Sequence, residues 1–174
     1  MGMLRKSCWV ALVVALCAGM AGCASLLGRS TVKGEWKPPE NPAREVALHF
    51  RSKGDDRGTV RMKLGDGGEA FEGTYVQVSL DTPAEVVQPI ILAWAPTWTE
   101  QEPLLHPDPW MEDITGFAAF VRHYDGKLVA ALEGEQRTMR CRLDLADPEK
   151  GVRGGASGSC QLSDGGTIAV QTGK

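Results

Sequence analysis

The side chains that could support nucleophilic or acid–base catalysis are few and scattered. The three histidines are His49, His106 and His123. A serine or cysteine nucleophile needs such a base within hydrogen-bonding reach. His49 and His123 occupy polar positions of period-two segments, where an exposed histidine is the simpler interpretation. The chain also has no Gly-x-Ser-x-Gly motif, which presents a nucleophilic serine in many hydrolases. We therefore expect no catalytic residues and no enzymatic activity.

Carboxylates are numerous, but their positions favour turns over metal or acid–base sites. The aspartates in turn-like segments are Asp55, Asp56, Asp66, Asp125 and Asp164. Aspartate is favoured in turns because its side chain hydrogen-bonds to nearby backbone. His106 and the acidic residues at 108, 112 and 113 form a denser group, but its spacing matches no zinc or calcium template. The glycine-rich segment 151–158 lacks the Lys-Ser/Thr ending of a phosphate-binding loop. The sequence predicts neither a metal nor a cofactor.

Residues 1–22 have the layout of a signal peptide. Arg5 and Lys6 supply a positive start, which an apolar run over residues 9–18 follows. Small residues then precede Cys23, as they precede a cleavage site. The apolar run is shorter than the roughly 20 residues that a membrane-spanning helix needs. A signal peptide that is simply removed, and releases a secreted protein, is an alternative that these residues leave open.

The ending Met20-Ala21-Gly22-Cys23 resembles the lipobox of bacterial lipoproteins, with Met20 where leucine is usual. In that family the thiol is diacylated, the chain is cut before the cysteine, and the new amine is acylated. The resemblance implies that Cys23 carries a lipid anchor, because two or more acyl chains hold a protein stably in a membrane. Enteric lipoproteins retained in the inner membrane have aspartate after the cysteine, whereas Ala24 follows Cys23 here. The resemblance to small outer-membrane lipoproteins of Gram-negative bacteria implies the periplasmic face of the outer membrane.

Charge and length limit the partners that we expect. Removal of residues 1–22 leaves 152 of 174 residues, which is enough for one domain with its own core. Loss of Arg5 and Lys6 leaves 17 of the 19 basic residues against 22 acidic ones, a formal net charge of −5. There is no basic stripe, so nucleic acid is not an expected partner. The acidic balance also argues against adhesion to anionic lipid headgroups beyond the anchor itself.

The cysteines indicate one disulfide. Two of the five cysteines belong to residues 1–22 and Cys23 is the expected lipidation site, so Cys141 and Cys160 remain as a pair in an oxidising compartment. Residues 138–145 alternate with Cys141 on the apolar face. A hairpin centred near residues 150–151 places Cys160 directly opposite, where Cβ atoms lie about 4.5–5.5 Å apart. That separation is close to the roughly 3.5–4.5 Å that a disulfide needs.

The chain divides into three parts. Residues 1–22 are the signal peptide, and residues 23–43, with three prolines and little periodicity, are expected to form a lipidated tether. Residues 44–174 are expected to form a single β domain, because period-two patterns begin at Arg44. We expect an antiparallel all-β sandwich, or a partly open barrel, of about eight strands with one hairpin disulfide.

Individual elements follow from alternation and turn chemistry. Strands are expected near residues 44–51, 60–64 and 71–80, where Gly73 marks a possible bulge. Residues 117–132 read as a hairpin around Asp125-Gly126, although 117–121 is also compatible with a helix. Segments 58–68 and 158–166 are weakly similar to each other. Either an internal duplication or shared hairpin chemistry explains that similarity.

A proline-rich excursion over residues 95–113 interrupts the β pattern. It and the segment before it contain several large apolar residues: Trp94, Trp98, Leu104, Leu105 and Trp110. Tryptophan is enriched in interface hot spots because it buries a large area at little conformational cost. These residues form a candidate partner surface. The alternative is that the excursion folds back and the tryptophans cover an open part of the sheet.

The sequence as a whole favours a non-enzymatic envelope lipoprotein that acts as an accessory or interaction module. An envelope protein is its expected partner, beside the membrane that holds its lipid. The alternative function is a β-barrel that binds a small apolar ligand or lipid in its cavity.

Overall fold

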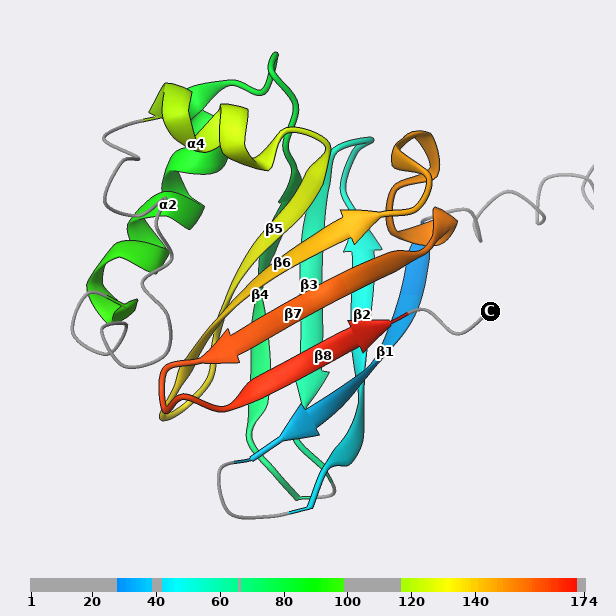
Figure 1. Ribbon diagram of the computed structural model, residues 1–174, viewed down its shortest axis with the longest axis vertical. Helices are drawn as coiled ribbons and strands as arrows, with labels where there is room; N and C mark the ends of the chain where they lie inside the picture. Colours follow the sequence, from blue (N-terminus) through cyan, green and yellow to red (C-terminus); the bar gives the residue numbers. More distant parts are fainter. Residues whose placement is uncertain (1–27, 39–41, 66, 99–116, 172–174) are drawn as a thin grey trace, which may run out of the picture.

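The computed structural model describes residues 28–38, 42–65, 67–98 and 117–171, and its core is a closed antiparallel β-barrel of eight strands (Figure 1). Each strand pairs with its neighbours in sequence, and β1 pairs with β8 to close the sheet. The strands are β1 (Arg29–Lys37), β2 (Arg44–Ser52), β3 (Arg57–Lys63), β4 (Ala70–Gln77), β5 (Lys127–Glu133), β6 (Thr138–Leu145), β7 (Ala156–Leu162) and β8 (Thr167–Gln171). The all-β prediction is confirmed, and the sheet is a closed barrel.

Side chains fill the inside of the barrel. Alternate residues of each strand point inward, as Val46, Leu48 and Phe50 do in β2, where each is 4% exposed or less. An eight-stranded barrel is just wide enough for its interior to be filled by side chains. Burial of each Val, Leu or Phe side chain contributes roughly 1.5–3 kcal/mol. The barrel interior is therefore the main hydrophobic core.

The predicted tether was assigned too long, because β1 lies within residues 23–43. Inward positions of β1 include Val32, which is 1% exposed, but also Ser30 and Gly34. A β-carbon on Gly34 would lie 2.9 Å from Ile168 Cγ2, so the small residue permits close packing against β8. Polar and small residues at inward positions hide the period-two pattern. The barrel domain thus starts at about Arg29 and not at Arg44.

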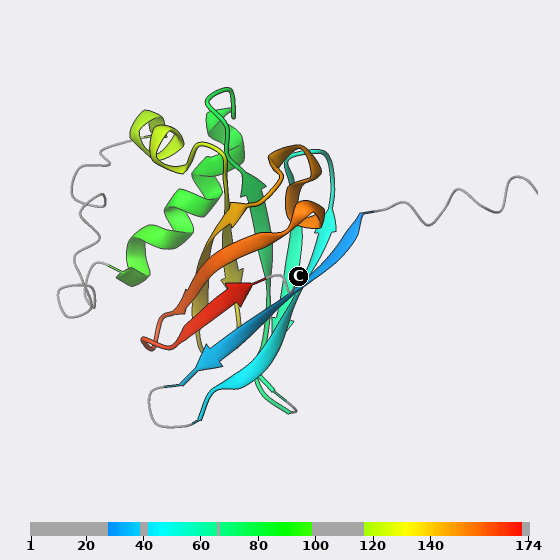
Figure 2. The ribbon, with the colours of Figure 1, turned by 45° about the vertical axis from the view of Figure 1, so that its right-hand side comes forward.

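In the described part of the insertion between β4 and β5, two helices cover the outer face of these strands (Figures 1 and 2). They are α2 (Ala84–Trp98) and α4 (Phe117–Tyr124). Together with the sheet they bury a second apolar cluster: Val76, Val78, Val87, Ile90, Trp94, Phe120, Val121, Tyr124 and Val129. Strands β4 and β5 therefore bury residues on both faces. No helix in the described part of the chain is long and apolar enough to cross a bilayer.

Neither helix was the first prediction for its segment. The hairpin expected over residues 117–132 is wrong in its first half, where the helical alternative holds and only β5 is a strand. Helix α2 continues to Trp98, so the irregular excursion does not begin at residue 95. Val87, Ile90 and Trp94 share one face at helical spacing, but apolar neighbours conceal that period. Pro89 lies within this helix, on its exposed side.

Gly73 lies in an unbroken ladder and not in a bulge. It pairs with Val60 of β3 and with Leu132 of β5, and pairing continues on either side. A β-carbon at this position would collide with the carbonyl oxygen of Ala131. The glycine therefore permits close approach of two strands in the curved wall.

The predicted disulfide is confirmed in its predicted register. Cys141 of β6 faces Cys160 of β7, with their Cα atoms 4.0 Å apart and both side chains buried. The bond joins the two strands that flank the 3-10 segment η2 (Pro148–Gly154).

We predict that the double variant Cys141→Ala/Cys160→Ala is roughly 2–4 kcal/mol less stable than the wild type, because the bridge restricts a loop of about 20 residues in the unfolded chain. Urea unfolding of both proteins measures the difference. Reduction of the wild type should move its midpoint toward that of the variant. Equal midpoints, or two free thiols in exported protein, would contradict the prediction.

Candidate ligand-binding site

Trp94 is a structural residue in the helix–sheet interface. It is 3% exposed, and its indole N–H donates a hydrogen bond to the carbonyl oxygen of Ala130 at 3.1 Å. Its ring packs edge-to-face against Phe120 and Tyr124, with centroids 5.7 and 5.6 Å away. The guanidinium of Arg140 lies 5.9 Å from its centroid. For Trp94 the alternative prediction therefore holds: this tryptophan covers the sheet and is not accessible to a partner.

The other residues of the candidate partner surface cannot be assigned a position. Trp98 is the last residue of α2, but its side chain lies outside the described part of the structure, as do Leu104, Leu105 and Trp110. The expected lipidation site Cys23 is also outside the described residues. The structure therefore does not test whether these residues form one surface.

The two histidines that the structure describes both lie on the surface. His49 is exposed on β2, as its polar-face position predicts, and its Nδ1 lies 3.1 Å from the Thr31 hydroxyl oxygen. His123 is exposed on α4, and its ring packs against Tyr124. His106 and its acidic neighbours lie outside the described residues. Among the residues that the structure describes, no three His, Cys, Asp or Glu side chains are grouped as metal ligands.

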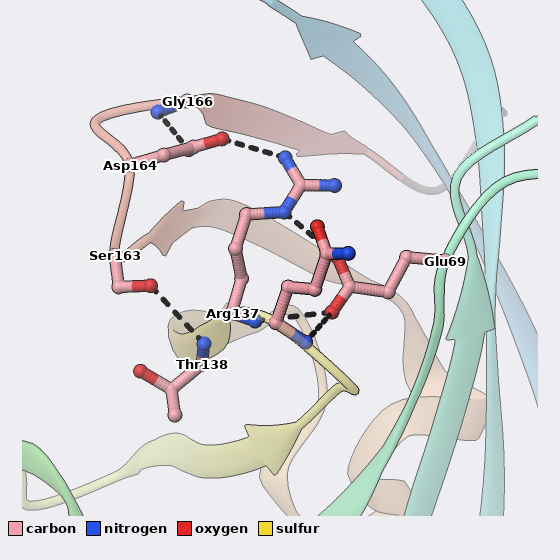
Figure 3. A network of polar contacts seen from close by, with 7 residues as sticks. Glu69, Arg137, Thr138, Ser163, Asp164 and Gly166 are labelled. Atoms are coloured by element: carbon pink, nitrogen blue, oxygen red, sulfur yellow. Dashed lines mark hydrogen bonds and ion pairs between the residues drawn. The ribbon is translucent and has the colours of Figure 1, made fainter.

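One end of the barrel, which we call the turn end, is held by a network of charged side chains (Figure 3). Glu69 precedes β4, Arg137 precedes β6, and Asp164 lies between β7 and β8. Arg137 donates from Nε to Glu69 at 2.8 Å and from Nη1 to Asp164 at 2.6 Å. Glu69 also accepts the backbone N–H groups of Gln136 and Arg137 at 2.8 and 3.0 Å. The network joins three hairpin turns.

Hydrogen bonds decide the charge state of this network. Burial by itself would raise the pKa of Glu69, but bonds from the backbone of Gln136 and from Arg137 hold that pKa below its ordinary value. The pKa of Asp164 is lowered in the same way, against burial, by the Gly166 N–H and by Arg137. The carboxylates of Glu69 and Asp164 are thus both matched by N–H donors within the network. The turn end is thus a structural clasp.

The opposite end, which we call the mouth, contains a hollow of about 520 Å³. The loop 52–56 between β2 and β3 forms one side, and η2 forms the other. The two lie at the same end of the barrel in Figures 1 and 2. The residues that line the hollow are Gly28, Ser30, Phe50, Ser52, Lys53, Gly54, Asp55, Tyr75, Gln77, Leu128, Glu149, Lys150, Gly151, Val152 and Arg153.

The floor of the mouth is apolar and aromatic. Phe50 and Tyr75 pack edge-to-face with ring centroids 5.3 Å apart. A β-carbon on Gly58 would lie 2.7 Å from the Tyr75 ring, so glycine makes room for the aromatic side chain. Val152 of η2 is 8% exposed and packs on the barrel core. The floor is thus continuous with the core of the protein.

One hydrogen bond joins segment η2 to a barrel strand, and further polar contacts hold its own turns. The side chain of Gln77 donates to the carbonyl oxygen of Pro148 at 2.8 Å. Asp147 caps the segment by accepting the N–H of Lys150, and its carboxylate pairs with the Lys150 ammonium at 2.6 Å. A Gly155 N–H bond to Val152 closes its last turn. The rim of the mouth is therefore preorganised, which lowers the ordering cost of binding a ligand.

Charges of both signs surround the hollow. Lys53 and Arg153 are exposed, and within the described residues neither has a carboxylate at ion-pair distance. Asp55 and Glu149 are exposed on the same two sides. Burial raises the pKa of the Tyr75 phenol, although a Ser52 hydrogen bond and the Arg153 charge act in the other direction. The mouth thus offers cations, carboxylates and a neutral phenol above an apolar floor.

A larger hollow of about 820 Å³ lies on the outer surface of β2, β3 and β4. It is open to solvent, and Arg61 in its wall pairs with Glu72 at 2.6 Å. Both side chains are more than half exposed, and such surface pairs contribute only about 0–1 kcal/mol. We take the mouth as the candidate site because it has a preorganised rim and an aromatic floor, whereas this hollow is an open face of the sheet.

The sequence did not identify the mouth. Its residues come from β1, β2, β4, β5 and two loops, and no spacing along the chain relates them. The one local signal was the glycine-rich, charged stretch between β6 and β7, which reads as a loop. Gly151 there has a φ of 56°, which favours glycine and allows η2 to fold over the barrel end.

We predict that Glu69→Gln lowers the free energy of unfolding by roughly 1–3 kcal/mol near neutral pH, because it removes the charge from a hydrogen-bonded carboxylate. A lowered pKa means that the folded protein binds fewer protons than the unfolded chain. This stabilisation is therefore complete above the ordinary value of 4.5 and is lost as pH falls through the folded-state pKa.

The difference between wild type and Glu69→Gln should consequently narrow below about pH 4.5, as measured by urea unfolding at a series of pH values. Glu135→Gln is a matched control, because Glu135 is exposed beside the same turn. A difference that stays constant down to about pH 3 would show that the Glu69 charge does not contribute as described.

Comparison with known proteins adds no relative to this description. No protein-family model matches the chain, and no significant match was found among curated proteins or solved structures.

Proposed function

We propose that this protein is a non-enzymatic, lipid-anchored binding module at the periplasmic face of the outer membrane. Its ligand is a small amphiphile with a charged group, held in the mouth of the barrel. The anchor is Cys23, on the resemblance of residues 20–23 to a lipobox.

The hollow at the mouth carries this proposal. Its volume of about 520 Å³ falls in the range of roughly 300–1,000 Å³ that is usual for small-molecule sites. Such sites combine an apolar lining with a few placed polar groups. In the mouth, polar groups line more of the surface than apolar ones do. Phe50, Tyr75 and Val152 supply the apolar part, and Lys53 and Arg153 are among the polar groups. The packed interior directs the ligand to the mouth and not to a deep cavity.

The chemistry of the mouth supports binding over catalysis. A general base works best when its pKa lies near the working pH. The pKa of the Tyr75 phenol is raised, which moves it away from neutrality. Lysine and arginine at the rim can hold an anion by charge-assisted hydrogen bonds.

A second candidate function is recognition of an envelope protein by the helical side of the molecule. Leu92 on α2 is 61% exposed and Phe117 on α4 is 36% exposed. Exposed apolar side chains mark an interaction site where they form a contiguous patch, which these two residues on neighbouring helices would contribute to. Photo-crosslinking in living cells from position 92 tests this candidate: one dominant protein adduct supports it, and no adduct counts against it.

We predict that native mass spectrometry of the lipidated protein from its own envelope detects a non-covalent small-molecule adduct. Arg153→Gln and Lys53→Gln should lower its occupancy, because each removes a cation at the mouth. Arg44→Gln and Lys63→Gln are matched controls at the turn end and should retain it. Protein without an adduct, or equal occupancy in all four variants, would contradict ligand binding at the mouth.

We also predict that Cys23→Ala abolishes incorporation of radiolabelled palmitate and releases the protein from membranes. The physical reason is loss of buried acyl chains, each CH₂ of which contributes about 0.8 kcal/mol to anchoring. Cys141→Ala is the control, because that cysteine is in the disulfide. Unchanged labelling of Cys23→Ala would reject the anchor.

A further inference from the structure

The mouth is the end of the barrel from which the anchor segment leaves. Gly28 lines the hollow, and its carbonyl oxygen accepts the N–H of Ser52 at 3.0 Å. Cys23 stands five residues before Gly28 in the sequence. Five residues span at most about 18 Å even when fully extended. If Cys23 is lipidated as proposed above, the mouth is therefore held within about 18 Å of the bilayer surface.

The turn end lies farther from the bilayer when the mouth faces the membrane. Strand β1 runs from the mouth to the turn end and has nine residues, which span about 30 Å at roughly 3.3 Å per residue. The clasp of Glu69, Arg137 and Asp164 lies at that far end (Figure 3). The short anchor thus selects which end of the barrel meets the membrane first.

An exposed apolar side chain is present at the same end. The loop 78–83 between β4 and α2 lies at the mouth end of the barrel in both ribbon views (Figures 1 and 2). Leu80 in this loop is 64% exposed. The Thr82 hydroxyl accepts the Ser79 N–H at 2.8 Å, which holds the turn that presents Leu80. A leucine at this position can enter the bilayer interface without any change of fold.

The charges at the mouth match a headgroup with both signs. Lys53 and Arg153 can bind a phosphate, which prefers such charge-assisted hydrogen bonds. Asp55 and Glu149 can accept hydrogen bonds from an ammonium group. Phosphoethanolamine carries both groups. Phosphocholine has no N–H to donate, and phosphoglycerol has no cation.

A phosphoethanolamine headgroup is also compatible with the acidic net charge of the protein. A formal charge of −5 disfavours anionic lipid surfaces, but a zwitterionic surface has no net charge to repel the protein. The balance of cations and carboxylates around the hollow is therefore consistent with docking on such a surface.

We propose that the mouth end docks on the membrane that holds the lipid anchor and binds the phosphoethanolamine headgroup of a phospholipid in the hollow, with Leu80 inserted beside it. This inference rests on the proposed function, because it names the source and class of the ligand at the same site.

Orientation is tested with the full lipidated protein in vesicles of phosphatidylcholine and phosphatidylethanolamine. Leu80→Cys and Glu135→Cys introduce a single reactive thiol at the mouth and at the turn end, because Cys141 and Cys160 are bonded to each other. Each is labelled with a fluorophore, and spin-labelled lipid is added as the quencher. Strong quenching at position 80 and little at position 135 is expected. Equal quenching at both positions, or none at position 80, overturns the docked orientation.

Headgroup choice is tested by changing the vesicles. Quenching at position 80 should fall when phosphatidylethanolamine is replaced by phosphatidylcholine alone. Adding Lys53→Gln or Arg153→Gln to Leu80→Cys should give the same loss, whereas Lys63→Gln or Arg44→Gln should not. Quenching that is equal without phosphatidylethanolamine, or greatest with phosphatidylglycerol, overturns the assignment to phosphoethanolamine.

Two further measurements separate the possible failures. Intact-mass analysis of the reconstituted protein reports acylation of Cys23, and a chain without acyl groups overturns both the anchor and this inference. If the chain is acylated and native mass spectrometry retains an adduct that depends on Arg153, but position 80 is not quenched, membrane docking fails while ligand binding at the mouth stands.

Discussion

Closure of the sheet between β1 and β8 is the constraint on which the rest of the structure depends. A sheet edge exposes unpaired backbone groups, and closure into a barrel removes both edges. Here it requires residues 29–37, which pair with β2 on one side and with β8 on the other. Closure encloses the core, fixes which side chains point inward, and turns the two ends of the barrel into distinct surfaces.

The two ends differ because different parts of the chain form them. At the turn end, one arginine joins three hairpin turns through two carboxylates, and these groups satisfy one another. At the mouth, η2 crosses the opening, places Val152 on the core and leaves Lys53 and Arg153 facing solvent. β1 begins six residues after Cys23, so under the proposed lipid anchor closure would also limit the distance between the mouth and the membrane. One topology thus gives an end that is held by ion pairs and an end that carries the candidate site.

Much of the strand pattern could be predicted, and the exceptions share a cause. Strands β2, β3 and β6 were predictable because one face of each is apolar and the other polar. Strand β1 was missed because Ser30 and Gly34 take inward positions, and α4 was assigned mainly to a strand because its segment is short. In each case packing from distant strands outweighed the local pattern. The mouth was less predictable still, because its residues come from four strands and two loops that no spacing along the chain relates. The burial of Trp94 was also hidden, because its contacts come from other segments.

By itself, the sequence determined the β class, the inward face of most strands, and the pairing of Cys141 with Cys160. These follow from alternation and turn chemistry between neighbouring strands, which are local properties. Only the tertiary structure decided that the sheet closes through β1, that helices α2 and α4 cover its outer face, and that a hollow with Tyr75 and Arg153 lies at one end. The physical reason is that closure, coverage and the mouth join residues far apart in the chain, whose proximity no local pattern encodes.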